Sequence, residues 1–72
     1  MFDAKIFGQR LFCLRKQLGK TQADIAKLLG VTPTQVSDME GGKTGTTMPR
    51  LCLLCDYFNV SADYLLGRTD SK

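Results

Sequence analysis

The segment from Pro33 to Glu40 carries the side chains of this sequence best suited to bind another molecule. In a helix over these residues Val36 and Met39 face inward, and the opposite side faces solvent. The outward set offers a hydroxyl, an amide and a carboxylate and consists of Pro33, Thr34, Gln35 and Asp38. A short, polar, outward-facing helix held by its neighbours fits the major groove of B-DNA, which is about 12 Å wide.

The composition offers little support for catalytic or metal chemistry. The chain has no histidine and only three cysteines, so a zinc site, a catalytic base or a triad has few candidate members. Cys52 and Cys55 are one helical turn apart, where small apolar side chains would serve as well, and no histidine joins Cys13 as a ligand. We expect no metal, no cofactor, no small-molecule ligand and no enzymatic activity.

The size and charge of the chain set further limits. Its 72 residues allow one domain, and no run approaches the roughly 20 apolar residues of a membrane span. Residues 1–37 have six basic and two acidic side chains, whereas the remainder has four basic and five acidic ones. The net charge of +3 permits a polyanionic partner without requiring one. Because no signal peptide is recognised, we expect a cytoplasmic protein with reduced cysteines.

An apolar stripe and a cap indicate the first two helices. A helix over residues 3–18 would bury one side, made of Phe7, Leu11, Leu14 and Leu18. Thr21 and Asp24 have the spacing of a capping box, in which each side chain accepts a hydrogen bond from the other residue's backbone N–H. The second helix therefore begins at Gln22, and it ends at Gly30, the residue best suited to a left-handed turn.

Three more helices complete the prediction of an all-α fold. The residues positioned to cap them are Thr32, Thr47 and Ser61. The connection before the helix over 33–40 is short, which forces the second and third helices to cross steeply. The helix over 48–58 has an inward stripe of Met48, Leu51, Leu54, Cys55 and Phe58. The last, short helix turns Leu65 inward, and no strand pattern is present.

Six segments of the sequence together are typical of one known family. They are Leu14-Arg15, Thr21–Ala26, Gly30–Thr32, Val36-Ser37, Glu40–Lys43 and Phe58–Gly67. The pattern resembles the Cro/C1-type helix-turn-helix domain of the XRE, or lambda-repressor-like, family, with a core over about residues 5–67 of the single domain 1–72. The resemblance implies a compact five-helix domain that binds operator-like palindromes of double-stranded DNA, usually as a dimer, and regulates transcription.

The resemblance also assigns individual contacts. The positions that match the family's phosphate contacts are Gln22, Thr32, Gly41 and Lys43. Those that match its base contacts are Pro33, Thr34, Gln35 and Asp38. Thr34 offers a methyl or a hydroxyl to a base, and Asp38 an acceptor for cytosine N4. Alternatives remain for several of them. For Gln22 the alternative is a solvated surface side chain, although we favour the phosphate contact, and for Lys43 the two are nearly even. Gln35 has capping-box spacing from Thr32. Asp38 could simply stand in solvent, and its negative charge near phosphates would lower nonspecific affinity.

Arg15 and Glu40 match a pair that forms a largely buried salt bridge in the resembling repressors. From the sequence alone they are two charges that interrupt apolar stripes, and phosphate contact is the alternative for Arg15. We favour the bridge, which would tie the first helix to the end of the third.

Two functional hypotheses follow from different classes of protein. The first is a sequence-specific transcriptional regulator, a repressor in our expectation, that places helix 33–40 in the major groove. The second is a protein-interaction module, such as an antitoxin-like or anti-repressor subunit, which the acidic Asp38 and the modest net charge favour slightly. A homodimer is expected in the first case, because a two-fold axis matches palindromic DNA. Leu53 and Tyr57 are the candidate dimer patch.

Overall fold

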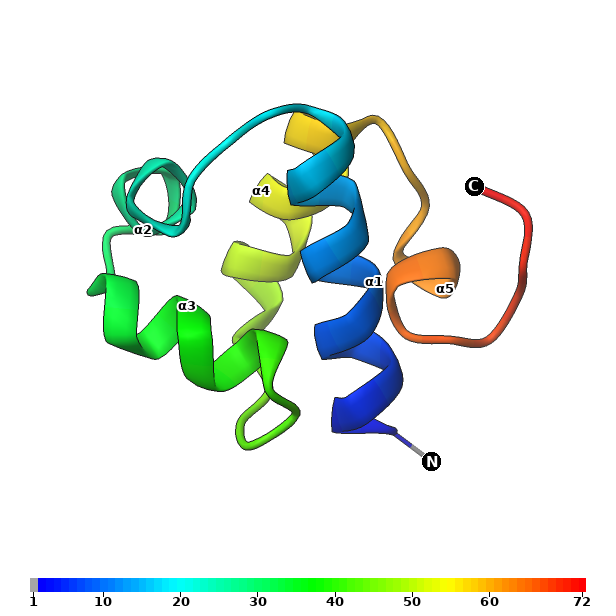
Figure 1. Cartoon of the computed structure of the whole chain (residues 1–72). Coiled ribbons are helices and arrows are strands. Elements are labelled where there is room, and N and C mark those ends of the chain that lie inside the picture. Colours follow the sequence, from blue (N-terminus) through cyan, green and yellow to red (C-terminus); the bar gives the residue numbers. More distant parts are fainter. Residues whose placement is uncertain (1) are drawn as a thin grey trace.

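The computed structural model describes residues 2–72 and contains five α-helices (Figure 1). They are α1, Ala4–Gln17; α2, Gln22–Leu29; α3, Pro33–Glu40; α4, Met48–Phe58; and α5, Ala62–Leu65. No strand occurs among these residues, so the predicted all-α fold is confirmed. No helix in this part of the chain has the length and apolar character needed to cross a bilayer.

Side-chain caps explain where the helices begin. The four predicted caps, each accepting a hydrogen bond from a backbone N–H of the first helical turn, are Thr21, Thr32, Thr47 and Ser61. The box on α2 is complete, because Asp24 Oδ2 accepts from the Thr21 N–H at 2.9 Å. Asp3 caps α1 in the same way, accepting from the N–H groups of Lys5 and Ile6. Local hydrogen bonding thus fixes all five helix starts.

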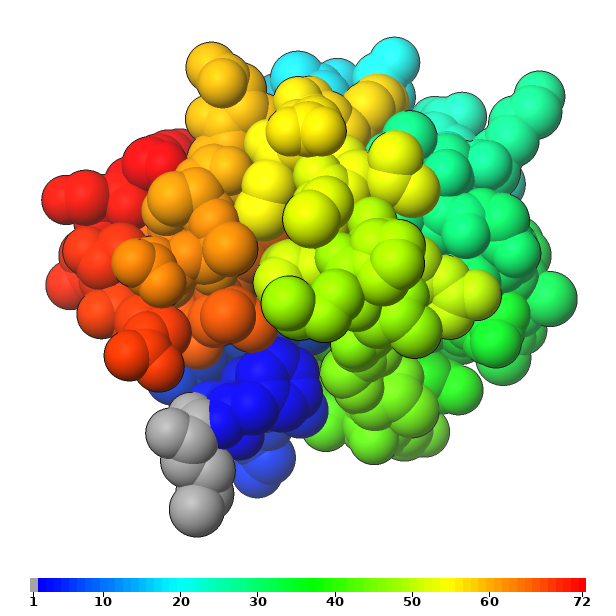
Figure 2. Space-filling view, turned by 180° about the vertical axis from the view of Figure 1, so that it is seen from behind, coloured from blue at the N-terminus to red at the C-terminus, as the bar shows by residue number. Residues whose placement is uncertain are grey.

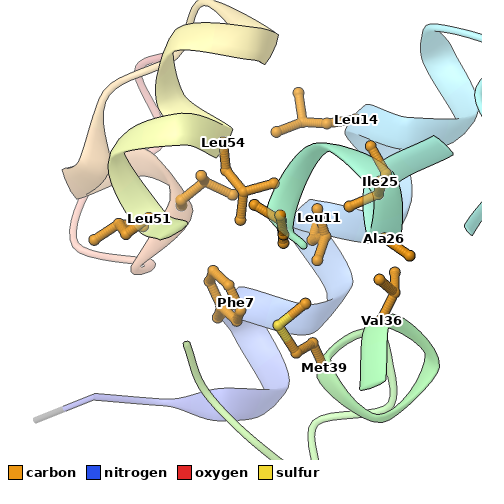
Figure 3. Close-up of a cluster of buried hydrophobic side chains, with 11 residues drawn as sticks. Phe7, Leu11, Leu14, Ile25, Ala26, Val36, Met39, Leu51 and Leu54 are labelled. Carbon is orange, nitrogen blue, oxygen red and sulfur yellow. The ribbon is translucent and has the colours of Figure 1, made fainter. Parts of the chain in front are cut away.

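The core lies where α1 meets the other helices (Figure 3). α3 packs on one side of α1 and α5 on the other, with α4 behind (Figure 1). Side chains with no exposed surface come from every helix and include Phe7, Leu11, Ile25, Val36, Leu54 and Leu65. Burial of one such side chain contributes about 1.5–3 kcal/mol, so this cluster holds the five short helices together.

Two members of the predicted inward stripes are exposed, and those predictions are wrong. Leu18 is 51% exposed because it caps the end of α1, where the chain turns away through Gly19 at φ +68°. Met48 is 76% exposed. Successive residues in a helix are rotated by about 100°, so residues three apart are displaced by about 60° around the helix axis. Met48 therefore lies about 90° from the middle of the side that buries Leu51 and Leu54.

Gly8 allows α1 and α3 to approach each other closely. A Cβ at this position would lie 2.3 Å from the carbonyl oxygen of Met39 and 2.7 Å from that of Glu40. From the sequence, a glycine inside a helix indicates only a local weakness of about 1 kcal/mol. In the structure it determines how the end of α3 sits against α1, and therefore where the exposed side of α3 lies.

Candidate nucleic-acid interface

α3 is anchored on its inner side and exposed on its outer side. Val36 is completely buried and Met39 is 4% exposed, so both anchor α3 as predicted. The turn from α2 passes through Gly30, at φ +70° and ψ +34°. On the outer side Pro33, Thr34, Gln35 and Ser37 are exposed, and Asp38 is half-buried. The four candidate base-contacting residues therefore all have surface exposure, and Ser37 joins them as an outward residue that the sequence interpretation did not include.

The capping box predicted between Thr32 and Gln35 is present. Gln35 Oε1 accepts from the Thr32 N–H at 2.9 Å, and Thr32 Oγ1 accepts from the Gln35 N–H at 3.2 Å. The Thr32 N–H is consequently unavailable to a phosphate. Gln35 keeps its amide NH₂ group, which donates only, so it retains a donor for an acceptor on a partner molecule.

The predicted bridge between Arg15 and Glu40 is present and nearly buried. Arg15 Nε donates to Glu40 Oε2 at 2.6 Å and Arg15 Nη2 to Glu40 Oε1 at 3.0 Å, with the two side chains 7% and 5% exposed. Arg15 Nη1 also donates to the carbonyl of Lys20 at 2.9 Å. The hydrogen bond with Glu40 raises the pKa of Arg15 above its ordinary value, so the guanidinium stays charged. Phosphate contact by Arg15 is excluded in this arrangement, because its donors face inward.

Gln22 joins the same network, which the sequence interpretation missed. Its Nε2 donates to Glu40 Oε1 at 3.1 Å, and Gln22 is half-buried at the first position of α2. An amide nitrogen has two hydrogens, so one remains for a second acceptor. Glu40 therefore holds the Gln22 amide in one orientation at the positive end of α2, a suitable place for an anion.

The loop after α3 is more ordered than its composition indicates. The Gly41 N–H donates to the Ser37 carbonyl at 2.9 Å and the Lys43 N–H to the Asp38 carbonyl at 2.9 Å. The Gly41 N–H therefore continues the hydrogen bonding of α3 and is not free to donate to a phosphate. Gly42, at φ +77°, packs against Lys5, and a Cβ there would lie 3.0 Å from Lys5 Cγ. The Lys43 side chain is exposed.

A cleft of about 180 Å³ separates α3 from the first turn of α4. Its lining residues are Val31, Gln35, Asp38, Met39, Thr44, Gly45 and Arg50. Arg50 is half-buried, and the sequence interpretation did not include it among the functional residues. A cation in the first turn of a helix, where acidic residues are favoured, is the sequence signal that could have found it.

The candidate dimer patch lies on α4, the helix that runs between the C-terminal segment and α2 with α3 in Figure 2. Leu53 is 42% and Tyr57 36% exposed. Tyr57 contacts the Phe58 ring edge-on, with centroids 5.1 Å apart. Exposure of these two side chains agrees with prediction, but two such residues make only a small apolar patch.

A short turn between two crossing helices, with the second helix polar and exposed, defines a helix-turn-helix protein. A family model described as helix-turn-helix, HTH_3, matches residues 14–65. The chain belongs to this family, and the resemblance drawn from its sequence is confirmed.

Known transcriptional regulators are similar in sequence to most of this chain. This chain is 37% identical over 60 residues to the cryptic phage CTXphi transcriptional repressor RstR of Vibrio cholerae, and the match covers 83% of this chain and 54% of RstR. It is 35% identical over 65 residues to the regulator PrpR of Mycobacterium tuberculosis, covering 90% of this chain and 13% of PrpR. The chain thus spans about half or less of the length of these two relatives.

Solved structures confirm the fold. The P22 c2 repressor, crystallised with synthetic operator 9T, is 33% identical, with a TM-score of 0.77 and coverage of 83% of this chain and 91% of that one. The fold also occurs within an enzyme. Hydroxypropylphosphonic acid epoxidase from S. wedmorenis is 29% identical, with a TM-score of 0.79, over 90% of this chain but 35% of the epoxidase. The fold alone therefore does not separate regulators from other proteins.

Proposed function

We propose that this chain is a sequence-specific, double-stranded DNA-binding transcriptional regulator that represses by placing α3 in the major groove. The observation that carries the proposal is the polar outer side of α3, held in place by the buried Arg15–Glu40 bridge. The same bridge orients Gln22 at the start of α2. The name of RstR as a transcriptional repressor and the operator complex of the P22 c2 repressor support this function.

The proposed base contacts are Pro33, Thr34, Gln35 and Asp38. Thr34 is exposed and offers a hydroxyl and a methyl, while Gln35 acts through its amide NH₂ group. Asp38 accepts from cytosine N4. These contacts specify sequence, because each base pair presents its own donor and acceptor pattern in the major groove.

The proposed phosphate contacts are Gln22, Thr32, Gly41 and Lys43. Gln22 acts through its second amide hydrogen and Lys43 through its exposed ammonium group. Thr32 acts through its hydroxyl, which exchanges its long hydrogen bond to Gln35 Oε1, at 3.4 Å, for one to the phosphate. Gly41 contributes by its lack of a side chain, which leaves room for the sugar–phosphate backbone. Such contacts fix the register of the protein on the duplex without reading its sequence.

We also propose that the active form is a homodimer on a palindromic site, acting in the cytoplasm and without enzymatic activity. Two-fold symmetry would space half-sites by about 34–36 Å, one turn of DNA. Leu53 and Tyr57 on α4 form the candidate contact. Sedimentation of a Leu53→Glu variant tests this, because an apolar interface does not tolerate a buried, unpaired carboxylate. A wild-type protein that stays monomeric at high concentration, both free and on DNA, contradicts the dimer.

Selection of binding sites from random duplex DNA is the direct test of the regulator. We expect a palindromic consensus, and binding that weakens by orders of magnitude between about 50 and about 200 mM salt, because bound phosphates release counterions. Binding that ignores salt would contradict the proposed mechanism. Recovery of a stoichiometric protein partner, together with no selected DNA, would instead favour the protein-interaction module.

A further inference from the structure

The helix proposed to read DNA carries no lysine or arginine, which is unusual for a surface facing phosphates. Its charged outward residue is Asp38, and a carboxylate near the DNA backbone lowers affinity for every sequence. A cation next to Asp38 would remove this penalty. The structure brings one there from another helix, because Arg50 of α4 lines the same cleft as Asp38 and Gln35.

Arg50 differs from the other three arginines in its partners. Arg10 pairs with Asp70, Arg15 with Glu40 and Arg68 with Asp63. Within residues 2–72, no carboxylate lies within 4.0 Å of the Arg50 guanidinium, and no side-chain hydrogen bond from it is found. Its backbone N–H is taken, donating to Thr47 Oγ1 at 3.4 Å.

The place of Arg50 on its helix adds to this positive charge. It lies in the first turn of α4, which contains no acidic residue. The N-terminus of a helix carries a partial positive charge, and a cation there is unfavourable unless an anion binds nearby. A guanidinium and a helix N-terminus together form an attractive position for a phosphate group, to which arginine donates two parallel hydrogen bonds.

We propose that Arg50 donates to a DNA phosphate at the edge of the groove that α3 enters, and that its charge offsets the repulsion between Asp38 and the DNA backbone. The inference rests on the proposed function and names a phosphate contact that lies outside the recognition helix. It also explains how an acidic residue is tolerated on the outer side of α3: the compensating cation comes from α4, across the cleft of about 180 Å³.

The test compares two alanine variants that each remove one positive charge, and a lysine variant that keeps it. Arg50→Ala should weaken binding to a selected duplex and to a scrambled duplex about tenfold each, and should reduce the slope of log affinity against log salt by about 0.9. Arg68→Ala is the matched control, since Arg68 is 69% exposed, beyond α5 and away from α3. It should change affinity less than twofold. Arg50→Lys, which keeps the charge, should retain most of the salt slope.

Coupling to Asp38 tests the second half of the inference. In an Asp38→Asn background, Arg50→Ala should cost only about threefold, because the repulsion that Arg50 offsets is already gone. Equal losses for the Arg50 and Arg68 variants would overturn the inference, as would an unchanged salt slope or an equal loss with and without Asp38. These outcomes require a wild-type protein that binds the selected duplex. A wild-type protein that binds no duplex refutes the proposed function itself.

Discussion

The two flanks of α3 are built on opposite principles. On the flank toward α1, the polar atoms of Arg15, Glu40 and Gln22 are joined by hydrogen bonds, and Gly8 lets the backbones nearly touch. On the flank toward α4, Asp38 and Arg50 line an open cleft without a mutual ion pair within 4.0 Å. On the first flank, called the closed flank below, the polar side chains bond to one another. On the second, the open flank, the charged side chains of Asp38 and Arg50 form no ion pair with each other. The difference indicates that one side of α3 fixes its position, and it supports the proposal that the other side contacts DNA.

Breaking the closed flank should have the largest effect. Glu40→Ala strands the buried guanidinium of Arg15 and frees the Gln22 amide, so we expect a loss of about 3–5 kcal/mol in the free energy of unfolding. Urea denaturation followed by circular dichroism measures it. The control is Asp70→Ala, which breaks the bridge between Arg10 and a fully exposed carboxylate and should cost about 1 kcal/mol or less. Equal losses for the two variants would contradict the distinction between the flanks.

Gly8→Ala tests the close approach on the same flank. The added Cβ would overlap two backbone carbonyl oxygens of α3, so α1 and α3 must separate, at a cost of about 1–3 kcal/mol despite the better helix propensity of alanine. Gln9→Ala, one residue further along and exposed, should be neutral within about 0.5 kcal/mol. If Gly8→Ala were stabilising, helix propensity rather than the crossing would dominate at this position.

Most of the fold could be predicted from the sequence, because a helix cap involves residues only three positions apart and an apolar stripe lies within one helix. Thr21, Thr32, Thr47 and Ser61 fixed the helix starts in this way. The bridge between Arg15 and Glu40 was predicted through the family resemblance, not through spacing. Distant contacts remained unpredicted. The roles of Gly8 and of the Gln22 amide, and the position of Arg50 in the same cleft as Asp38, depend on how separate helices cross, which no local pattern records.

Thr34 on the outer side of α3 and Lys43 in the loop after it should respond differently to mutation. Thr34→Ala should change which duplex is selected, with a discrimination loss of about 1–3 kcal/mol at one base pair. Lys43→Ala should weaken all duplexes alike and lower the salt slope by about 0.9. Neither should alter the unfolding free energy by more than about 0.5 kcal/mol, since both side chains are exposed. Competition binding with single-base variants of the selected site measures the first, and a salt titration the second.

If Lys43→Ala changed base preference, the loop after α3, and not α3 itself, would determine which bases are recognised. A Thr34→Ala variant that lost stability would show that the outer side of α3 also supports the fold. Either result would blur the division between a positioning flank and a recognition flank.

The smallest expected effect concerns the start of α2, which carries Gln22 into the closed flank. Hydrogen bonds from Thr21 hold the pKa of Asp24 below its ordinary value. A carboxyl with a lower pKa in the folded state stabilises the fold above its unfolded pKa, and this contribution is lost as pH falls through the folded pKa. Unfolding measured from neutral to acidic pH should therefore show a smaller acid loss in Asp24→Asn than in the wild type. Identical pH profiles would mean that the cap of α2 does not depend on the charge of Asp24. The network of Arg15 and Glu40 would then position Gln22 without help from that charge.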